Sequence, residues 1–398
     1  MDKRLEANMR FLCDESRMLT GITVAYGTTT YSEWAQYGRA QEIDRVENGF
    51  IPAVRPLIPD TIYDLASLTK LFTAVVTLAL VESGQLSLDE TVGQIDPRFI
   101  HLQNVTVGDV LSFRISLQTP GRIDTAPTRE EGLKRLFRRI RLPNACHPRL
   151  FRYERDGHQI CHRGQDGSQP VRRDSDLDSF ACRHARNLRC RAEGASAVDA
   201  SAIYYEHRIE GERQILRTSP PCGLPHDPKA PAAQRQRARS LRSRRAVFLA
   251  KDMVRFAQAL LSGELIRRET LCEIGVNRTG FSHGDGTYRQ YLGYLCFAKH
   301  PLQRLSEVPH WMGARSIGLS GFTGNHLSID PDAERFVLFL GNRCHGRVSH
   351  IVPPEVDGFD CLRFECARRR TYQMERRAHG SILREICVFQ RRNAACAD

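Results

Sequence analysis

The residues whose types and spacing most clearly suggest catalysis are Ser67 and Lys70, which stand three positions apart in the run SLTK. The apolar sequence after them predicts a helix, and residues three apart on a helix share one face. A serine at a helix N-terminus lies beside backbone N–H groups that have no partner within the helix. A lysine set into an apolar helix loses hydration, which favours the neutral amine that can accept a proton. The pair therefore indicates a serine nucleophile with a lysine base. The alternative for so short a motif is a capping serine followed by a solvated lysine.

The neighbouring segments are predicted to hold this pair in place. Residues 63–83 have the pattern of a strand end that leads into a long apolar helix, and Gly84 stands where a helix commonly ends. Other elements are expected from their periodicity: helices within 105–112, 130–141 and 251–261, two strands within 21–42, and one strand within each of 316–328 and 334–342. At the end of the last strand, Asn342 and Arg343 could meet a substrate carboxylate or form a solvated strand end.

Strands at both ends of the chain, with helices between them, indicate an α/β fold of the α+β sandwich type. We expect its antiparallel sheet to come from about residues 15–66 and 250–350, with a helical region over 67–248. Together these segments are predicted to form one domain, 1–355. Residues 356–398 are expected to be a separate tail rich in Arg and Cys.

The longest motif-bearing run is YDLASLTKLFTAVVTLALVESGQLSLDETV, which resembles the active-site segment of the serine β-lactamase and penicillin-binding-protein superfamily. The branch it resembles most is that of the class C β-lactamase-related serine hydrolases, which include esterases and peptidases. Three further blocks occur in family order: VTVGDVLSFRISLQTPGRID, KDMVRFAQALLSGEL and RSIGLSGFTGNHLSIDPDAERFVLFLGNR. The resemblance covers residues 21–349 with gaps. It implies a β-lactamase-like antiparallel sheet flanked by helices, with an all-helical region inserted.

The resemblance also implies roles for particular residues. Ser67 would be the acylated nucleophile and Lys70 its partner. Tyr153, in RLFRYERD, stands where the family has a tyrosine whose phenolate assists proton transfer. The residues after it, Glu154 and Arg155, depart from the family's Y-x-N or Y-S-x pattern. A half-buried structural tyrosine is the alternative for Tyr153.

A third family motif, K-T-G or H-T-G, stands here as Leu319-Ser320-Gly321. Ser320 keeps the hydroxyl, and Gly321 would let the backbone approach the substrate closely. The resemblance places the second oxyanion N–H at Phe322, working with the N–H of Ser67. Leu319 removes the cation or imidazole that helps β-lactam-binding members hold a substrate carboxylate. This departure counts against efficient β-lactam hydrolysis and leaves ester or amide hydrolysis open.

The composition of the chain is uneven. Its 398 residues carry a formal charge of +12, and six of the 58 basic residues are lysine. Three stretches, 154–200, 231–249 and 356–398, lose hydrophobic periodicity and gain Arg, His, Cys and Gln. We hypothesise that they are translated out of frame, and genuine Arg-rich loops are the alternative. With one extra nucleotide after the Tyr153 codon, a permitted codon choice for ERDGHQICHRG gives YSEMGTKYVIEA from Tyr153, which restores the family's tyrosine motif.

Three functions follow as hypotheses. The first is a serine hydrolase that forms an acyl-enzyme on an ester, amide or D-amino-acid peptide bond. The second is a catalytically inactive, frame-disrupted relic of such an enzyme, and the third is an Arg-rich nucleic-acid-binding protein. The first implies a small-molecule ester, amide or peptide substrate, with no cofactor, no metal and no nucleic-acid partner. No apolar run reaches 18 residues, so no membrane span is expected, and the lack of an apolar signal region favours a cytoplasmic location.

Overall fold

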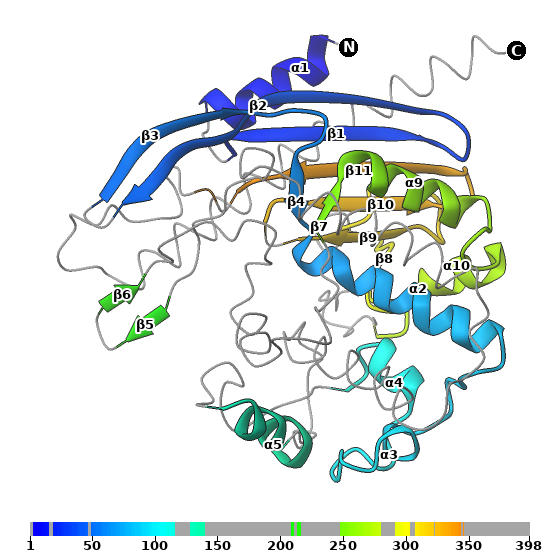
Figure 1. Ribbon diagram of the computed structural model, residues 1–398. Helices are drawn as coiled ribbons and strands as arrows, with labels where there is room; N and C mark the ends of the chain where they lie inside the picture. Colours follow the sequence, from blue (N-terminus) through cyan, green and yellow to red (C-terminus); the bar gives the residue numbers. More distant parts are fainter. Residues whose placement is uncertain are drawn as a thin grey trace, which may run out of the picture.

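An antiparallel sheet of seven strands, in the order β3-β2-β1-β11-β10-β9-β8, dominates the computed structural model (Figure 1). The structure describes residues 3–15, 19–46, 49–115, 128–139, 208–210, 213–215, 247–279, 291–302, 307–321, 323–343 and 345. The strands of this sheet are β1 (Gly21–Thr28), β2 (Ser32–Val46), β3 (Gly49–Pro56), β8 (Phe297–Ala298), β9 (Ile317–Ser320), β10 (His326–Asp330) and β11 (Arg335–Gly341). Strands from both ends of the chain thus meet at the β1–β11 pair, which confirms the predicted α/β fold.

Both faces of the sheet are buried at β11, which is apolar along nearly its whole length. Val337 and Phe339 pack on one face with the N-terminal helix α1 (Lys3–Arg10) and the π-helical turn Phe11–Glu15. Phe336 and Leu338 pack on the other face. Since neighbouring residues of a strand point to opposite faces, a strand that is apolar throughout must be covered on both sides.

Helices α2 (Thr69–Glu82), α9 (Ala250–Leu261) and α10 (Arg268–Ile274) cover the second face (Figure 1). Phe256 of α9 stacks on Phe72 of α2 with ring centroids 4.0 Å apart, which joins the two helices. Helix α2 ends at Glu82 and is followed by Gly84 with φ of +72°, as expected from the sequence. None of the described helices is long and apolar enough to cross a membrane.

The part of the chain that follows α2 forms a smaller hydrophobic cluster. Helices α3 (Val92–Ile95), α4 (Val107–Leu111) and α5 (Arg129–Arg139) contribute to it, and Phe99 meets Phe137 edge to face with centroids 4.8 Å apart. Two strand pairs lie outside the main sheet: β4 (Ile62–Asp64) with β7 (Val247–Leu249), and β5 (Arg208–Glu210) with β6 (Arg213–Ile215). The sequence indicated β4 as the strand end before α2. The other three strands correct the prediction that residues 67–248 are helical, because β5 and β6 lie within that region and β7 at its end.

One part of the predicted strand pattern is wrong. Residues 316–328 form two strands, β9 and β10, rather than one. The chain turns between them, where the N–H of Gly324 donates to the carbonyl of Gly321 at 3.1 Å and Gly324 has φ of +94°. A left-handed glycine reverses the chain at little steric cost, and the apolar periodicity on either side conceals such a break.

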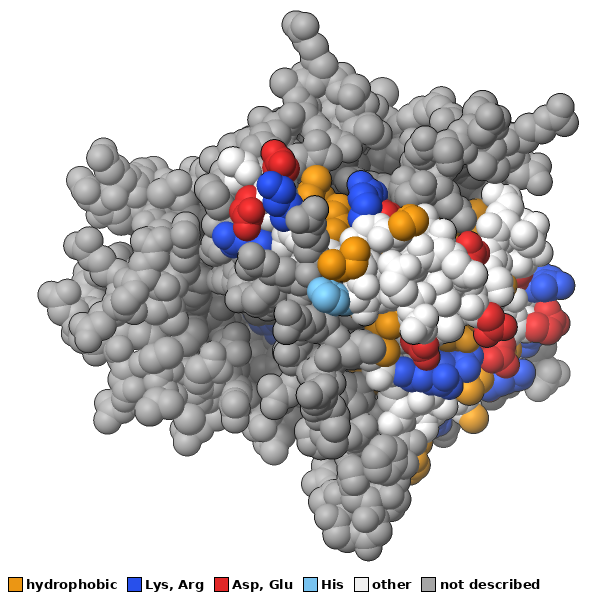
Figure 2. Space-filling view, turned by 90° about the horizontal axis from the view of Figure 1, so that it is seen from below, with side chains coloured by type: hydrophobic (Ala, Val, Ile, Leu, Met, Phe, Trp, Pro, Cys, Tyr) orange, Lys and Arg blue, Asp and Glu red, His pale blue; other side chains and the backbone are white. Residues whose placement is uncertain are grey.

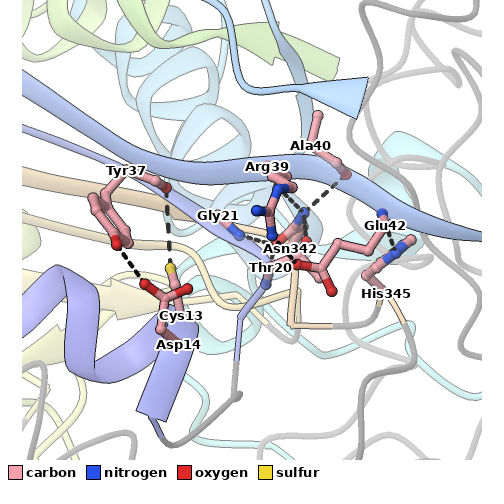
Figure 3. A network of polar contacts seen from close by, with 10 residues as sticks. All are labelled: Cys13, Asp14, Thr20, Gly21, Tyr37, Arg39, Ala40, Glu42, Asn342 and His345. Atoms are coloured by element: carbon pink, nitrogen blue, oxygen red, sulfur yellow. Dashed lines mark hydrogen bonds and ion pairs between the residues drawn. The ribbon is translucent and has the colours of Figure 1, made fainter. Parts of the chain in front are cut away.

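The junction of β11 with β1 and β2 is held by a buried asparagine. The side-chain oxygen of Asn342 accepts hydrogen bonds from the N–H groups of Thr20 and Gly21, both at 3.0 Å. Its amide nitrogen donates to the carbonyls of Arg39 and Ala40, at 3.2 and 3.0 Å (Figure 3). Asn342 therefore links β11 to β1 and β2 by buried hydrogen bonds to their backbone. Its side chain is neither solvated nor directed at a substrate.

Candidate active site

The start of α2 brings Ser67 and Lys70 together. Ser67 lies in a single 3₁₀ turn (Ala66–Leu68) that continues directly into α2, so the two side chains are nearly one turn apart. The side-chain nitrogen of Lys70, Nζ, donates a hydrogen bond to the hydroxyl oxygen of Ser67 at 3.2 Å. Lys70 is buried, with 6% of its surface exposed, whereas Ser67 is half-buried. A half-exposed hydroxyl beside a buried amine is the arrangement that a lysine-activated serine nucleophile requires.

The turn that presents Ser67 has an unusual backbone. Ala66, directly before the serine, has φ of +48°, which costs a residue with a Cβ about 1–2 kcal/mol. The carboxylate of Asp64 accepts a hydrogen bond from the N–H of Ala66 at 2.8 Å. The turn is thus held in its left-handed conformation by a side chain at the end of β4.

Strand β9 runs beside this turn, and Gly321 marks the closest approach. A Cβ atom at Gly321 would lie 2.8 Å from the carbonyl oxygen of Leu65 and 3.4 Å from the Cβ of Ala66. Glycine is therefore required here by contact with the turn that carries Ser67. This contact is with the protein's own backbone, and the predicted close approach of Gly321 to a substrate stays a prediction.

The two residues before Gly321 face opposite sides of the sheet. Leu319 is buried in the core cluster that includes α2, with 3% exposure, so it fills space where the family motif has a cation or imidazole. Ser320 pairs in register with His326, and His326 pairs with Phe339 on the face covered by α1. The Ser320 side chain therefore points away from the face against which α2 packs.

A buried polar cluster surrounds Ser320. Its hydroxyl donates to the carboxylate of Glu307 and lies 2.9 Å from Nδ1 of His326. The other ring nitrogen, Nε2, is 2.6 Å from the hydroxyl of Ser328, and Glu307 Oε2 is 3.9 Å from Nδ1. The Ser320 hydroxyl is thus engaged by two protein side chains, Glu307 and His326.

Tyr63 is a tyrosine that chain position alone places near Ser67, but its environment is unsuited to proton transfer. It is 1% exposed, and its hydroxyl lies 2.8 Å from that of Thr23. Burial raises the pKa of Tyr63, an effect that the hydrogen bond with Thr23 only partly opposes. Its phenol stays protonated at neutral pH and serves as a core hydrogen-bonding group.

Several predicted site residues lie outside the described part of the chain. These site residues are Tyr153 and Phe322. The stretches 154–200 and 356–398 also lie outside the described part, as do residues 231–246 of the stretch 231–249. Ser67 and Lys70 are brought together, and Gly321 borders their turn. Within the described ranges, no group of three or more His, Cys, Asp or Glu side chains is placed to hold a metal ion.

Asp64, Thr323 and Asn325 were not predicted from the sequence. The Asp64 side chain holds the turn carrying Ser67, and the side chains of Thr323 and Asn325 bond the Asp64 backbone carbonyl from the loop after β9. Glu307 and His326 were not predicted either. These residues form no motif with their neighbours in sequence, because their partners lie far away in the chain. The one available signal was the presence of polar residues directly after GLSGF, where an apolar strand had been expected.

Comparison with known proteins supports the same fold. The family described as Beta-lactamase matches residues 27–147, which include Ser67 and Lys70. The octameric penicillin-binding protein homologue from Pyrococcus abyssi is 18% identical with a TM-score of 0.56, covering 89% of this chain and 75% of its own. The unliganded selenomethionyl simvastatin synthase from Aspergillus terreus is 16% identical with a TM-score of 0.56, covering 85% and 92%. A class C β-lactamase is 13% identical with a TM-score of 0.56, covering 96% and 98%. No curated protein sequence matches this chain significantly.

Proposed function

We propose that the protein is a serine hydrolase, a proposal supported by the similarity of residues 27–147 to the family described as Beta-lactamase and by the fold that the chain shares with a penicillin-binding protein homologue and a class C β-lactamase. It acts through an acyl-enzyme on an ester, amide or D-amino-acid peptide bond. The observation that carries the proposal is the 3.2 Å contact between the buried Lys70 amine and the Ser67 hydroxyl at the start of α2. We also propose that residues 1–355 form a single domain.

The proposed reaction has two halves. With Lys70 in its neutral form, the Ser67 oxygen attacks the substrate carbonyl carbon while the Ser67 proton moves to the lysine nitrogen. The bond from that carbon to the leaving group then breaks, the leaving group takes up a proton, and the acyl group remains on Ser67. In the second half, water attacks the acyl carbon, the bond from that carbon to the Ser67 oxygen breaks, the carboxylic acid leaves, and a proton from the water returns to the Ser67 oxygen. The N–H groups of Ser67 and Phe322 are the proposed oxyanion donors, and Tyr153 the proposed proton-transfer partner.

Labelling by a fluorophosphonate probe tests the nucleophile. The wild-type protein should carry one adduct on the peptide containing Ser67, and Ser67→Ala should carry none. Lys70→Met should label at least about 10²-fold more slowly, which is the usual scale of a lost general base. Ser83→Ala removes an exposed hydroxyl at the other end of α2 and should label like the wild type. Equal labelling of wild type and Ser67→Ala would contradict the assignment.

The preferred substrates are esters or amides that lack a carboxylate near the scissile bond. This proposal is supported by Leu319, which is packed in the core at the position where the resemblance implies a cation in β-lactam-binding members. Matched pairs of aryl esters, with a neutral and a carboxylate-bearing acyl group, test this preference. Higher kcat/KM for the carboxylate-bearing esters would contradict it.

The second candidate is an inactive relic of such a hydrolase, favoured by Glu154 and Arg155 after Tyr153, where the family pattern is broken. Accurate resequencing of the coding DNA through the codons for Tyr153, Ala230 and Val356 separates the two. Single-nucleotide corrections at these points would indicate an intact enzyme. An unchanged sequence, together with no labelling at Ser67, would indicate the relic.

The third candidate, a nucleic-acid binder, has less support. On α5, Lys134 lies 3.1 Å from Glu130 and Arg135 lies 3.3 Å from Glu131, so these basic side chains are paired with acids. The face shown in Figure 2 has acidic and basic side chains interspersed among its described residues. Binding to duplex DNA that weakens steeply with salt would favour this candidate instead.

A further inference from the structure

Two sets of hydrogen bonds hold the turn that carries Ser67, and the first set lies within the turn itself. Strand β4 ends at Asp64, whose carboxylate accepts the N–H of Ala66 at 2.8 Å. Asp64 is buried, with 7% exposure. Because Ala66 is in a left-handed conformation that alanine disfavours, the turn keeps this shape only while its surroundings hold it.

The second set of hydrogen bonds joins the turn to the loop after β9, which is adjacent in space but 259 to 261 positions away in the chain. The carbonyl oxygen of Asp64 accepts two hydrogen bonds at 2.7 Å, from the hydroxyl of Thr323 and from the amide nitrogen of Asn325. That amide nitrogen also donates to the Thr323 hydroxyl at 3.0 Å. Thr323 and Asn325 are each 1% exposed, so water does not compete for these bonds.

Asn325 is in turn anchored to the sheet. Its side-chain oxygen accepts the N–H of Gly341 at the end of β11 at 2.9 Å, and its backbone carbonyl accepts the N–H of Gly321 at 2.7 Å. One residue therefore connects three points: its side chain reaches the end of β11 and the residue that closes β4, and its backbone carbonyl reaches the end of β9. All three points would have to shift together if Asn325 moved.

These hydrogen bonds connect the turn that carries Ser67 to the end of strand β9. Gly321 leaves no room for a Cβ against the Leu65 carbonyl, so turn and strand are already in contact. We infer that Asp64, Thr323 and Asn325 are positioning residues, which set the placement of Ser67 relative to the end of β9. The inference rests on the proposed function of Ser67 for its catalytic meaning and on the described contacts for its geometry.

A matched pair at Thr323 tests the inference kinetically. Thr323→Val keeps the shape of the side chain and removes the donor to Asp64, whereas Thr323→Ser keeps the donor. A displacement of about 1 Å costs about 10²-fold in rate, so Thr323→Val should lower kcat and the fluorophosphonate labelling rate by about 10-fold or more. KM should change little, and Thr323→Ser should retain most of the rate. Equal kcat in Thr323→Val and wild type would overturn the inference.

Hydrogen exchange gives a readout that does not depend on catalysis. In wild type and Thr323→Ser, the amide of Ala66 should be protected, because it is bonded to the Asp64 carboxylate. In Thr323→Val it should exchange faster, while a peptide over α4 should be unchanged. Unchanged exchange at Ala66 in Thr323→Val would overturn the inference. If the wild type does not label at Ser67, the proposed function fails, and the exchange data still decide whether the turn is held this way.

Discussion

Substitution of Asn342 by alanine is predicted to destabilise the whole fold rather than one edge of it. This side chain links the end of β11 to Thr20 and Gly21 at the start of β1, and to Arg39 and Ala40 of β2 (Figure 3). It is 1% exposed, so water cannot replace the lost partners without local opening. These contacts join the C-terminal strands of the sheet to the N-terminal ones.

The size of the effect follows from the groups that lose a partner. Asn342→Ala removes the acceptor of two buried N–H groups, and each such loss costs about 1–3 kcal/mol. The carbonyls of Arg39 and Ala40 have a second lone pair each and add less. The expected loss is about 2–6 kcal/mol, which is a large part of the about 5–15 kcal/mol by which domains are stable.

Urea unfolding followed by tryptophan fluorescence measures this loss. Asn342→Asp keeps acceptor oxygens for Thr20 and Gly21 but sets a buried carboxylate oxygen against the two carbonyls, so it should also be strongly destabilised. Ser83→Ala, at an exposed position, should stay within about 0.5 kcal/mol of the wild type. A loss below about 1 kcal/mol for Asn342→Ala would refute the reasoning, since one orphaned N–H alone should cost that much.

Three further outcomes are expected. Burial by itself would raise the pKa of Asp96, but the hydrogen bonds from Arg98 and its positive charge outweigh burial and lower that pKa. The Asp96 carboxylate therefore stabilises the fold at neutral pH. Asp96→Asn should therefore cost about 1 kcal/mol at pH 7 and progressively less as pH falls through the folded-state pKa, and a pH-independent difference would contradict this. Burial raises the pKa of the Cys296 thiol, so peptide mapping after iodoacetamide should find it unmodified in the native protein and modified in denaturant; native modification would contradict the burial. Phe256→Ala should lower stability by about 3–5 kcal/mol in urea unfolding, because it removes the ring stacked on Phe72, and a loss under about 1 kcal/mol would contradict the packing of α9 on α2.

Local patterns predicted much of the fold. The apolar run after Lys70 and the glycine at 84 indicated α2 and its end, because helix periodicity and a left-handed glycine are local properties. The short turn near residue 30 likewise indicated the β1–β2 pair. The break between β9 and β10 was missed, since apolar residues continue on both sides of the turn.

The candidate site was predictable where its chemistry lies within one element. Ser67 and Lys70 are neighbours on one helix, so their spacing implies their contact. The bond between Asp64 and Asn325 joins residues 261 positions apart, and no local pattern encodes such a contact. The sequence predicted that Gly321 lets the backbone approach a substrate, but it could not show that the glycine also lies against the Leu65 carbonyl.

The central claim is that Ser67 forms an acyl-enzyme, and trapping that species tests it most directly. The protein would be mixed with p-nitrophenyl acetate and quenched in acid within one turnover, followed by intact mass measurement and peptide mapping. The account predicts one acetyl group on Ser67 in the wild type and in Ser83→Ala, and none in Ser67→Ala. Absence of the acetyl group from Ser67 in the wild type, or the same acetylation of Ser67→Ala, would contradict it.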